Sequence, residues 1–162
     1  MTRHFGVGIG LLASVAGLVG CDHATKAYAQ ANLQHHAAVV LVPGVLDLGY
    51  TENRDIAFSV FSHLRLAPPA WALGVVALVT MVAIVVAWMR RGQRPWLEHA
   101  AFAMILAGAI GNALDRLVSG RVVDFIHIHF WPVFNIADVL IVAGVALLLL
   151  LGRRREPAAV TQ

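Results

Sequence analysis

Residues 134–155 read FNIADVLIVAGVALLLLLGRRR: a polar start, an unbroken apolar run and a cluster of three arginines. The run from 139 to 151 carries no charged side chain, and a helix that crosses a bilayer needs about 20 mostly apolar residues. Together with its polar start, this stretch predicts a transmembrane helix over residues 135–152. The stretch also shows how the chain is organised, because charge is confined to the two ends of the run.

Three further apolar runs have the same form. They predict helices over residues 5–26, 66–89 and 96–115, each ended by charged side chains. The sequence therefore predicts an all-α integral membrane protein of four transmembrane helices. We expect one membrane domain over residues 1–162, with its loops at 27–65, 90–95 and 116–134 and a tail at 153–162.

The composition excludes other classes of protein. Of the 162 residues, 59% are hydrophobic and 13% are charged, whereas soluble domains carry about 25% charged residues. A single cysteine excludes a disulfide scaffold. The net charge of +3 is more typical of a topology signal than of a nucleic-acid-binding surface, so we expect no nucleic acid partner.

The arginines predict the orientation. Arg3 at the N-terminus and arginine clusters in the loop 90–95 and after residue 152 fall on one side of a four-helix chain. The positive-inside rule places that side, with both termini, in the cytoplasm. The loops 27–65 and 116–134 then face outward, and most of the acids lie on or near that outer side.

The two outer loops carry strand patterns. Residues 39–42 and 45–48 are aliphatic runs on either side of Pro43-Gly44, which predicts a short β-hairpin lying on the membrane surface. Residues 124–130 alternate in a period of two, which predicts a further short strand. The expected fold is thus four helices with a small extracytoplasmic β-hairpin or β-cradle.

Four aspartates lie at the outer helix ends or in the loop between two of them. They are candidates for chemistry, because ionisable groups at membrane depth are costly and indicate function. An asparagine stands three residues before an aspartate at the end of one helix and at the start of the next, so each pair shares a helix face. Two close carboxylates tend to share one proton, which an aspartic hydrolase needs to activate water and polarise a carbonyl. Spacing does not say which two form the pair among Asp22, Asp115, Asp124 and Asp138.

Other interpretations of these residues stay open. Asp115-Arg116 can be an interfacial ion pair, and Asp138 can cap its helix. His127 and His129 lie two apart and invite a metal interpretation, but no cysteine or carboxylate pattern supports it, so we expect no metal. Residues 18–21, Leu-Val-Gly-Cys, resemble a lipoprotein lipobox, although three more apolar runs follow.

A proton- or ion-conducting membrane protein is the alternative from another functional class. It predicts carboxylates distributed across the bilayer. Here they gather at one interface, and no acid lies in the middle of a predicted helix, which favours a hydrolase.

Four sequence blocks, in order along the chain, resemble those of lipoprotein signal peptidase, the bacterial signal peptidase II. They are Asp22-His23-Ala24-Thr25-Lys26; Asn53 with Ala57-Phe58-Ser59; Gly111-Asn112-Ala113-Leu114-Asp115-Arg116 with Val122-Val123-Asp124-Phe125; and Phe134-Asn135-Ile136-Ala137-Asp138. The resemblance implies an aspartic endopeptidase of the bacterial cytoplasmic (inner) membrane that needs no cofactor and acts as a monomer. Its substrates would be diacylglyceryl-modified prolipoproteins, cut on the N-terminal side of the lipidated cysteine, with membrane lipid as surroundings.

The same resemblance assigns roles to residues of this chain. It implies a catalytic dyad of Asp124 and Asp138, with the active site near the extracytoplasmic face. It implies a substrate and water site lined by Asn53, Asn112, Arg116 and Asn135 and supported by Asp22 and Lys26, with Asp115 structural. One departure stands out: Arg54-Asp55-Ile56 replaces a loop that commonly contains glycine, which affects loop conformation and substrate preference more than the dyad.

Overall fold

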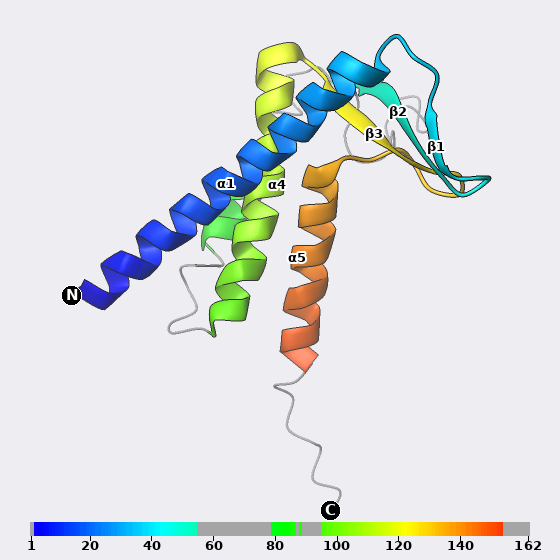
Figure 1. Cartoon of the computed structure of the whole chain (residues 1–162). Helices are drawn as coiled ribbons and strands as arrows, with labels where there is room; N and C mark the ends of the chain where they lie inside the picture. The colour runs from blue at the N-terminus through cyan, green and yellow to red at the C-terminus, as the bar shows by residue number, and fades with distance from the viewer. Residues whose placement is uncertain (1, 55–78, 87, 89–94, 154–162) are drawn as a thin grey trace, which may run out of the picture.

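The computed structural model describes residues 2–54, 79–86, 88 and 95–153 (Figure 1). Three long helices are α1 (Thr2–Leu33), α4 (Trp96–Ser119) and α5 (Ile136–Arg153). Residues 79–86 and 88 are also helical. Three strands complete the described part of the chain: β1 (Val39–Val42), β2 (Leu46–Asn53) and β3 (Val122–Ile128).

Helices α4 and α5 pack closely because small residues line their contact. A Cβ atom at Gly144 of α5 would lie 2.6 Å from Ile105 Cγ1 and 2.7 Å from the Ala101 carbonyl oxygen of α4. A Cβ atom at Gly108 would run into the Ala137 carbonyl oxygen. Small residues that let backbones approach are the usual basis of helix pairing in membranes. Helix α1 crosses α4 on another side (Figure 1).

Two helices of the described residues are long and apolar enough to cross a membrane, namely α4 and α5. The expected helices over 96–115 and 135–152 are therefore found, and α4 runs one turn further to Ser119. The first expected helix, 5–26, is part of the longer α1. Most of the expected helix 66–89 lies outside the described residues, so four membrane crossings remain a prediction.

The sheet is antiparallel in the order β1-β2-β3 and lies beyond the first turn of α5 (Figure 1). The expected hairpin is present, with Gly44 in the left-handed region (φ 71°) at its turn. The expected strand over 124–130 occupies 122–128 and pairs with β2, so the hairpin becomes a three-stranded sheet. The fold is thus helical with a small sheet, and not purely α.

The path from α4 through β3 to α5 brings distant residues together. Helix α4 ends at Ser119, and Gly120, with a φ of 68°, is its left-handed C-cap. The Gly120 N–H donates to the Arg116 carbonyl oxygen at 3.0 Å. Strand β3 follows at once, and the chain then folds back so that Phe134 bridges to Ile126. As a result, the C-terminal end of α4, strand β3 and the first turn of α5 meet at one place.

Candidate active site

Asp138 lies in the first turn of α5 and is held by a reciprocal cap. The Asn135 side-chain oxygen accepts the Asp138 backbone N–H at 3.1 Å, and Asp138 Oδ2 accepts the Asn135 backbone N–H at 3.2 Å. This is the capping-box arrangement, with asparagine and aspartate in its two positions. The expected capping role of Asp138 is therefore real, but it uses only one of the two carboxyl oxygens.

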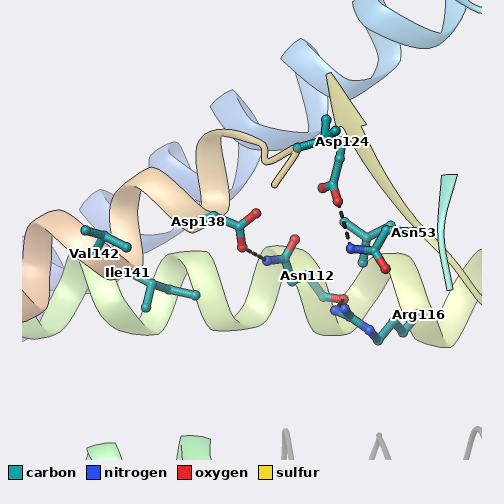
Figure 2. Close-up of a pocket in the computed structure, with 9 residues that line it drawn as sticks. Asn53, Asn112, Arg116, Asp124, Asp138, Ile141 and Val142 are labelled. Carbon is teal, nitrogen blue, oxygen red and sulfur yellow. Dashed lines mark hydrogen bonds between the residues drawn. The ribbon is translucent and has the colours of Figure 1, made fainter. Parts of the chain in front are cut away.

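The second oxygen of Asp138 faces helix α4. Its Oδ1 accepts a hydrogen bond from Asn112 Nδ2 at 2.8 Å (Figure 2). The two asparagine–aspartate patterns of the sequence are thus neighbours in space, as the short connection between them predicts. Asn112 Oδ1 in turn accepts from Lys26 Nζ at 3.0 Å and from Asn135 Nδ2 at 3.2 Å, which fixes the orientation of its amide.

Asp124 lies on β3 with 2% of its surface exposed. Asn135 Nδ2 donates to its Oδ1 at 2.6 Å, and Asn53 Nδ2 from β2 donates to its Oδ2 at 2.9 Å. Burial, together with the charge of Asp138, raises the pKa of Asp124 to about 6 against the lowering effect of the hydrogen bonds from Asn53 and Asn135. A carboxyl group with this pKa exchanges a proton near neutral pH.

A cavity of about 160 Å³ opens beside the two carboxyl groups. Figure 2 shows Asp124 and Asp138 reaching toward it from β3 and α5, with Asn112 and Arg116 below them on α4. Arg116 Nη1 donates to the Asn112 carbonyl oxygen at 3.1 Å. The residues that line the cavity are Asn53, Asn112, Arg116, Val122, Asp124, Val133, Asp138, Ile141 and Val142.

A second cavity, of about 330 Å³, adjoins the first and shares Asp138 and Val142 with it. Its other walls are apolar and come from the end of β3, the following loop and α5, namely Ile128, Phe130, Trp131, Phe134, Val139 and Ala143. The Asp138 carboxyl group therefore stands between a cavity lined by several polar side chains and a cavity whose other walls are apolar.

The other two candidate aspartates form a separate cluster around one lysine. Lys26 Nζ lies 2.6 Å from Asp22 Oδ2 and 2.7 Å from Asp115 Oδ2, and Asp22 and Lys26 are 0% and 4% exposed. Asp22 Oδ1 also accepts the Ala137 backbone N–H at 2.8 Å, which ties α1 to the start of α5. Asp115 pairs with Lys26 and approaches His23 Nε2 at 3.6 Å, in keeping with its expected structural position.

The two histidines have different partners. His127 Nε2 lies 3.3 Å from Thr51 Oγ1, and His129 Nε2 lies 2.7 Å from Asp47 Oδ2. Among residues 2–54, 79–86, 88 and 95–153, no group of three or more histidine, cysteine or acidic side chains is arranged to hold a metal ion.

The structure thus brings together six of the eight residues named from the sequence in one hydrogen-bonded group with a cavity beside it. The other two, Asp22 and Lys26, are connected to that group through the hydrogen bond from Lys26 to Asn112. Sequence reasoning missed the apolar lining residues, because nothing distinguishes Val133 or Ile141 from other aliphatic residues. The block Ala57-Phe58-Ser59 and the departure at Asp55-Ile56 lie outside the described residues.

Comparison with known proteins fits this arrangement. Residues 14–152 match the profile of the family described as signal peptidase (SPase) II. The chain belongs to the signal peptidase II family. It is 38% identical to the lipoprotein signal peptidase of Syntrophotalea carbinolica over 82% of this chain and 84% of that one. It is 38% identical to that of Ectopseudomonas mendocina over 86% of this chain and 85% of that one.

Solved structures share the fold of this signal peptidase II family member. One bacterial membrane enzyme, determined by the in meso method at 2.3 Å, matches with a TM-score of 0.77 and 23% identity over 94% of each chain. A second, determined at 1.9 Å, matches with a TM-score of 0.79 and 22% identity over 91% of this chain and 94% of that one. At such identities, the likeness supports the fold alone.

Proposed function

We propose that this protein is a membrane aspartic endopeptidase that removes the signal peptide from diacylglyceryl-modified prolipoproteins. The observation that carries the proposal is the pair Asp124 and Asp138, which share one cavity and one bridging residue, Asn135. The family supplies the substrate class, since its curated relatives are lipoprotein signal peptidases. The bond cut would be the peptide bond on the N-terminal side of the lipidated cysteine.

The two carboxyl groups would divide the work of an aspartic mechanism. The ionised member takes a proton from a water molecule in the cavity, whose oxygen then attacks the scissile carbonyl carbon. The protonated member donates a hydrogen bond to the carbonyl oxygen and so stabilises the oxyanion of the tetrahedral intermediate. When the C–N bond breaks, the proton taken from water passes to the amine of the cysteine. The sum is addition of one water across one peptide bond.

The surrounding amides would keep the two carboxyl groups oriented, with one ionised and one protonated. Asn112, Asn135 and Asn53 each donate to a carboxyl oxygen, so the two acids have fixed directions before substrate arrives. Arg116 lines the same cavity and would offset negative charge as the oxyanion develops. The pKa of about 6 for Asp124 supports one proton shared at neutral pH.

The apolar cavity and the sheet would receive the lipid part of the substrate. The second cavity begins at Asp138 and offers apolar walls for the side chains or acyl chains next to the scissile bond. On the hairpin, Val40 and Leu41 are more than half exposed, and Phe130 in the neighbouring loop is 81% exposed. Exposed apolar groups of this kind suit contact with membrane lipid. The arginine clusters would then mark the cytoplasmic side, with the site at the extracytoplasmic face.

The test is cleavage by the purified full chain in detergent, with a diacylglyceryl-modified precursor as substrate. We expect Asp124→Asn and Asp138→Asn each to lower kcat by ~10³-fold or more while the protein still folds. The reason is that an amide in place of the carboxyl group can neither take up nor give a proton. Asp47→Asn is the matched control, since Asp47 lies on the same sheet outside the cavity, and it should cleave normally. Full activity of both dyad variants would refute the mechanism.

A further inference from the structure

The contact between Asn53 and Asp124 depends on the last three pairs of the β2–β3 ladder. Their partners are Thr51 with Asp124, Glu52 with Val123, and Asn53 with Val122. Asn53 reaches Asp124 diagonally across this ladder, on the face toward the cavity. Because side chains alternate between faces, a slip of one residue would turn Asn53 away from Asp124.

A bulge separates these pairs from the rest of the sheet. The register shifts between Leu48 and Thr51, where β2 carries one more residue than β3. Bulges loosen a ladder locally and are common beside active sites, where they redirect side chains. The short segment that holds Asn53 therefore receives less support from the earlier pairs than an unbroken strand would give it.

The opposite face of this segment carries a charged link between the two strands. Arg121 Nε lies 3.2 Å from Glu52 Oε1, and the Tyr50 hydroxyl donates to the same oxygen at 3.0 Å. Both charged side chains are about 30% exposed, so they are only partly screened by water. Arg54 Nη2 lies further away, at 3.9 Å from Glu52 Oε2. Glu52 directly precedes Asn53, and Arg121 directly precedes Val122, which is the ladder partner of Asn53.

We propose that Glu52 and Arg121 form a positioning pair that holds Asn53 against Asp124 from the opposite face of the sheet. Its effect on catalysis rests on the proposed function, but its effect on Asp124 itself does not. Neither residue touches the cavity, so both act through the strand register. Glu52 lies in β2 beyond the bulge, and Arg121 lies between the end of α4 and the start of β3. The pair therefore connects these two segments.

The consequence is a change in the proton affinity of Asp124. The hydrogen bond from Asn53 favours the charged carboxylate and lowers its pKa, so loosening Asn53 raises that pKa. The other groups that face Asp124 stay in place: Lys26 from α1, Arg116 from α4, Asn135 before α5 and Asp138 within it. We expect an upward shift of about 0.5–1 pH unit, the equivalent of one ordinary hydrogen bond.

Two single variants separate positioning from direct electrostatics, because they change charge in opposite senses. Glu52→Gln removes a negative charge, and Arg121→Gln removes a positive one. If the pair acts only through its field, the Asp124 pKa falls in the first variant and rises in the second. If the pair positions Asn53, the pKa rises in both. The exchanged double variant, Glu52→Arg with Arg121→Glu, should restore it.

The measurement is a pH titration of the Asp124 carboxyl carbon by NMR on the full chain in detergent, assigned with Asp124→Asn. The limb of the pH–kcat profile that reports the titration of Asp124 should move by the same amount. Asn53→Ala should show the full shift, and adding Glu52→Gln to it should add nothing. The matched control is Asp47→Asn, which breaks the Asp47–His129 pair on the other side of the bulge and should leave the titration unchanged.

The outcomes are distinct. Upward shifts in both single variants, with recovery in the exchanged pair, support the positioning role. Shifts of opposite sign, no shift, or an equal shift in Asp47→Asn overturn it. The titration needs no turnover, so it decides this point even if Asp124→Asn were to keep full activity and the proposed mechanism failed.

Discussion

The molecule contains two pairs of aspartates, each with one buried and one partly buried member, that differ in what holds them. Asp22 and Asp115 share the ammonium group of Lys26, at 2.6 and 2.7 Å. Asp124 and Asp138 accept hydrogen bonds from asparagine amides and line a cavity. In the first pair, an opposite charge compensates for burial. In the second pair the hydrogen-bond donors are neutral amides, and burial raises the pKa of Asp124 to about 6.

The contrast shows how one small region can be both rigid and reactive. The Lys26 cluster ties α1 to α4 and, through Asp22 and the Ala137 N–H, to the start of α5. The same ammonium also fixes the Asn112 amide, which donates to Asp138. The ion-paired cluster thus orients the pair that is held by asparagine amides. The contrast can be tested with variants that affect one pair and spare the other.

The largest effect on stability should come from Lys26→Met. It leaves the buried carboxylate of Asp22 and the partly buried one of Asp115 without their shared cation, and breaking a buried ion pair costs ~3–5 kcal/mol. Unfolding in mixed detergent, followed by circular dichroism, measures the loss. Asp138→Asn is the counterpart: it should lose activity but less stability than Lys26→Met, because its amide oxygen still accepts one of the two hydrogen bonds that Asp138 accepts. Equal stability of the two variants would remove the distinction between the pairs.

The next effect is a pH dependence of stability that arises from Asp124. Its pKa in the folded protein, about 6, lies above the ordinary value of 3.8. The folded state therefore binds more protons than the unfolded state between these values, and stability falls as pH rises from about 4 to about 6. The loss from this group amounts to up to about 3 kcal/mol and levels off above that range. The measurement is the free energy of unfolding of the native chain and of Asp124→Asn at a series of pH values across this range. The free energy should fall more steeply with pH in the native chain, and equal slopes would contradict the raised pKa.

A smaller loss of stability should follow from Gly111→Ala, which crowds Asp22 of the Asp22–Asp115 pair and leaves the Asp124–Asp138 pair unchanged. A Cβ atom there would lie 2.6 Å from Asp22 Oδ2, so the carboxylate must move from Lys26 or from the Ala137 N–H. Overpacking of this kind costs ~1–3 kcal/mol. The midpoint of thermal unfolding measures it. Gly152→Ala, which meets nothing within 4 Å near the end of α5, is the control and should be neutral or slightly stabilising.

The sequence predicted the helices α4 and α5 because long apolar runs have few other stable conformations in a membrane protein. It also predicted the hairpin, since Pro43-Gly44 between aliphatic runs is a local signal. The third strand was foreseen as a strand, but its pairing with β2 was not. Pairing joins residues about 70 positions apart, and nothing local in either strand specifies its partner or the bulge between Leu48 and Thr51.

By itself the sequence determined which polar residues lie near the ends of apolar helices, where burying a charged group in the membrane is costly. It therefore determined the set of four aspartates and the asparagines near them. Only the tertiary structure decided how the set divides. Lys26 lies four residues from Asp22 along α1 but reaches Asp115 only because α1 crosses α4. Asn53 reaches Asp124 only because β2 pairs with β3 beyond a bulge. Proton affinity depends on what lies within a few ångströms of a carboxyl group, and those distances are set by packing between segments that are remote in the chain.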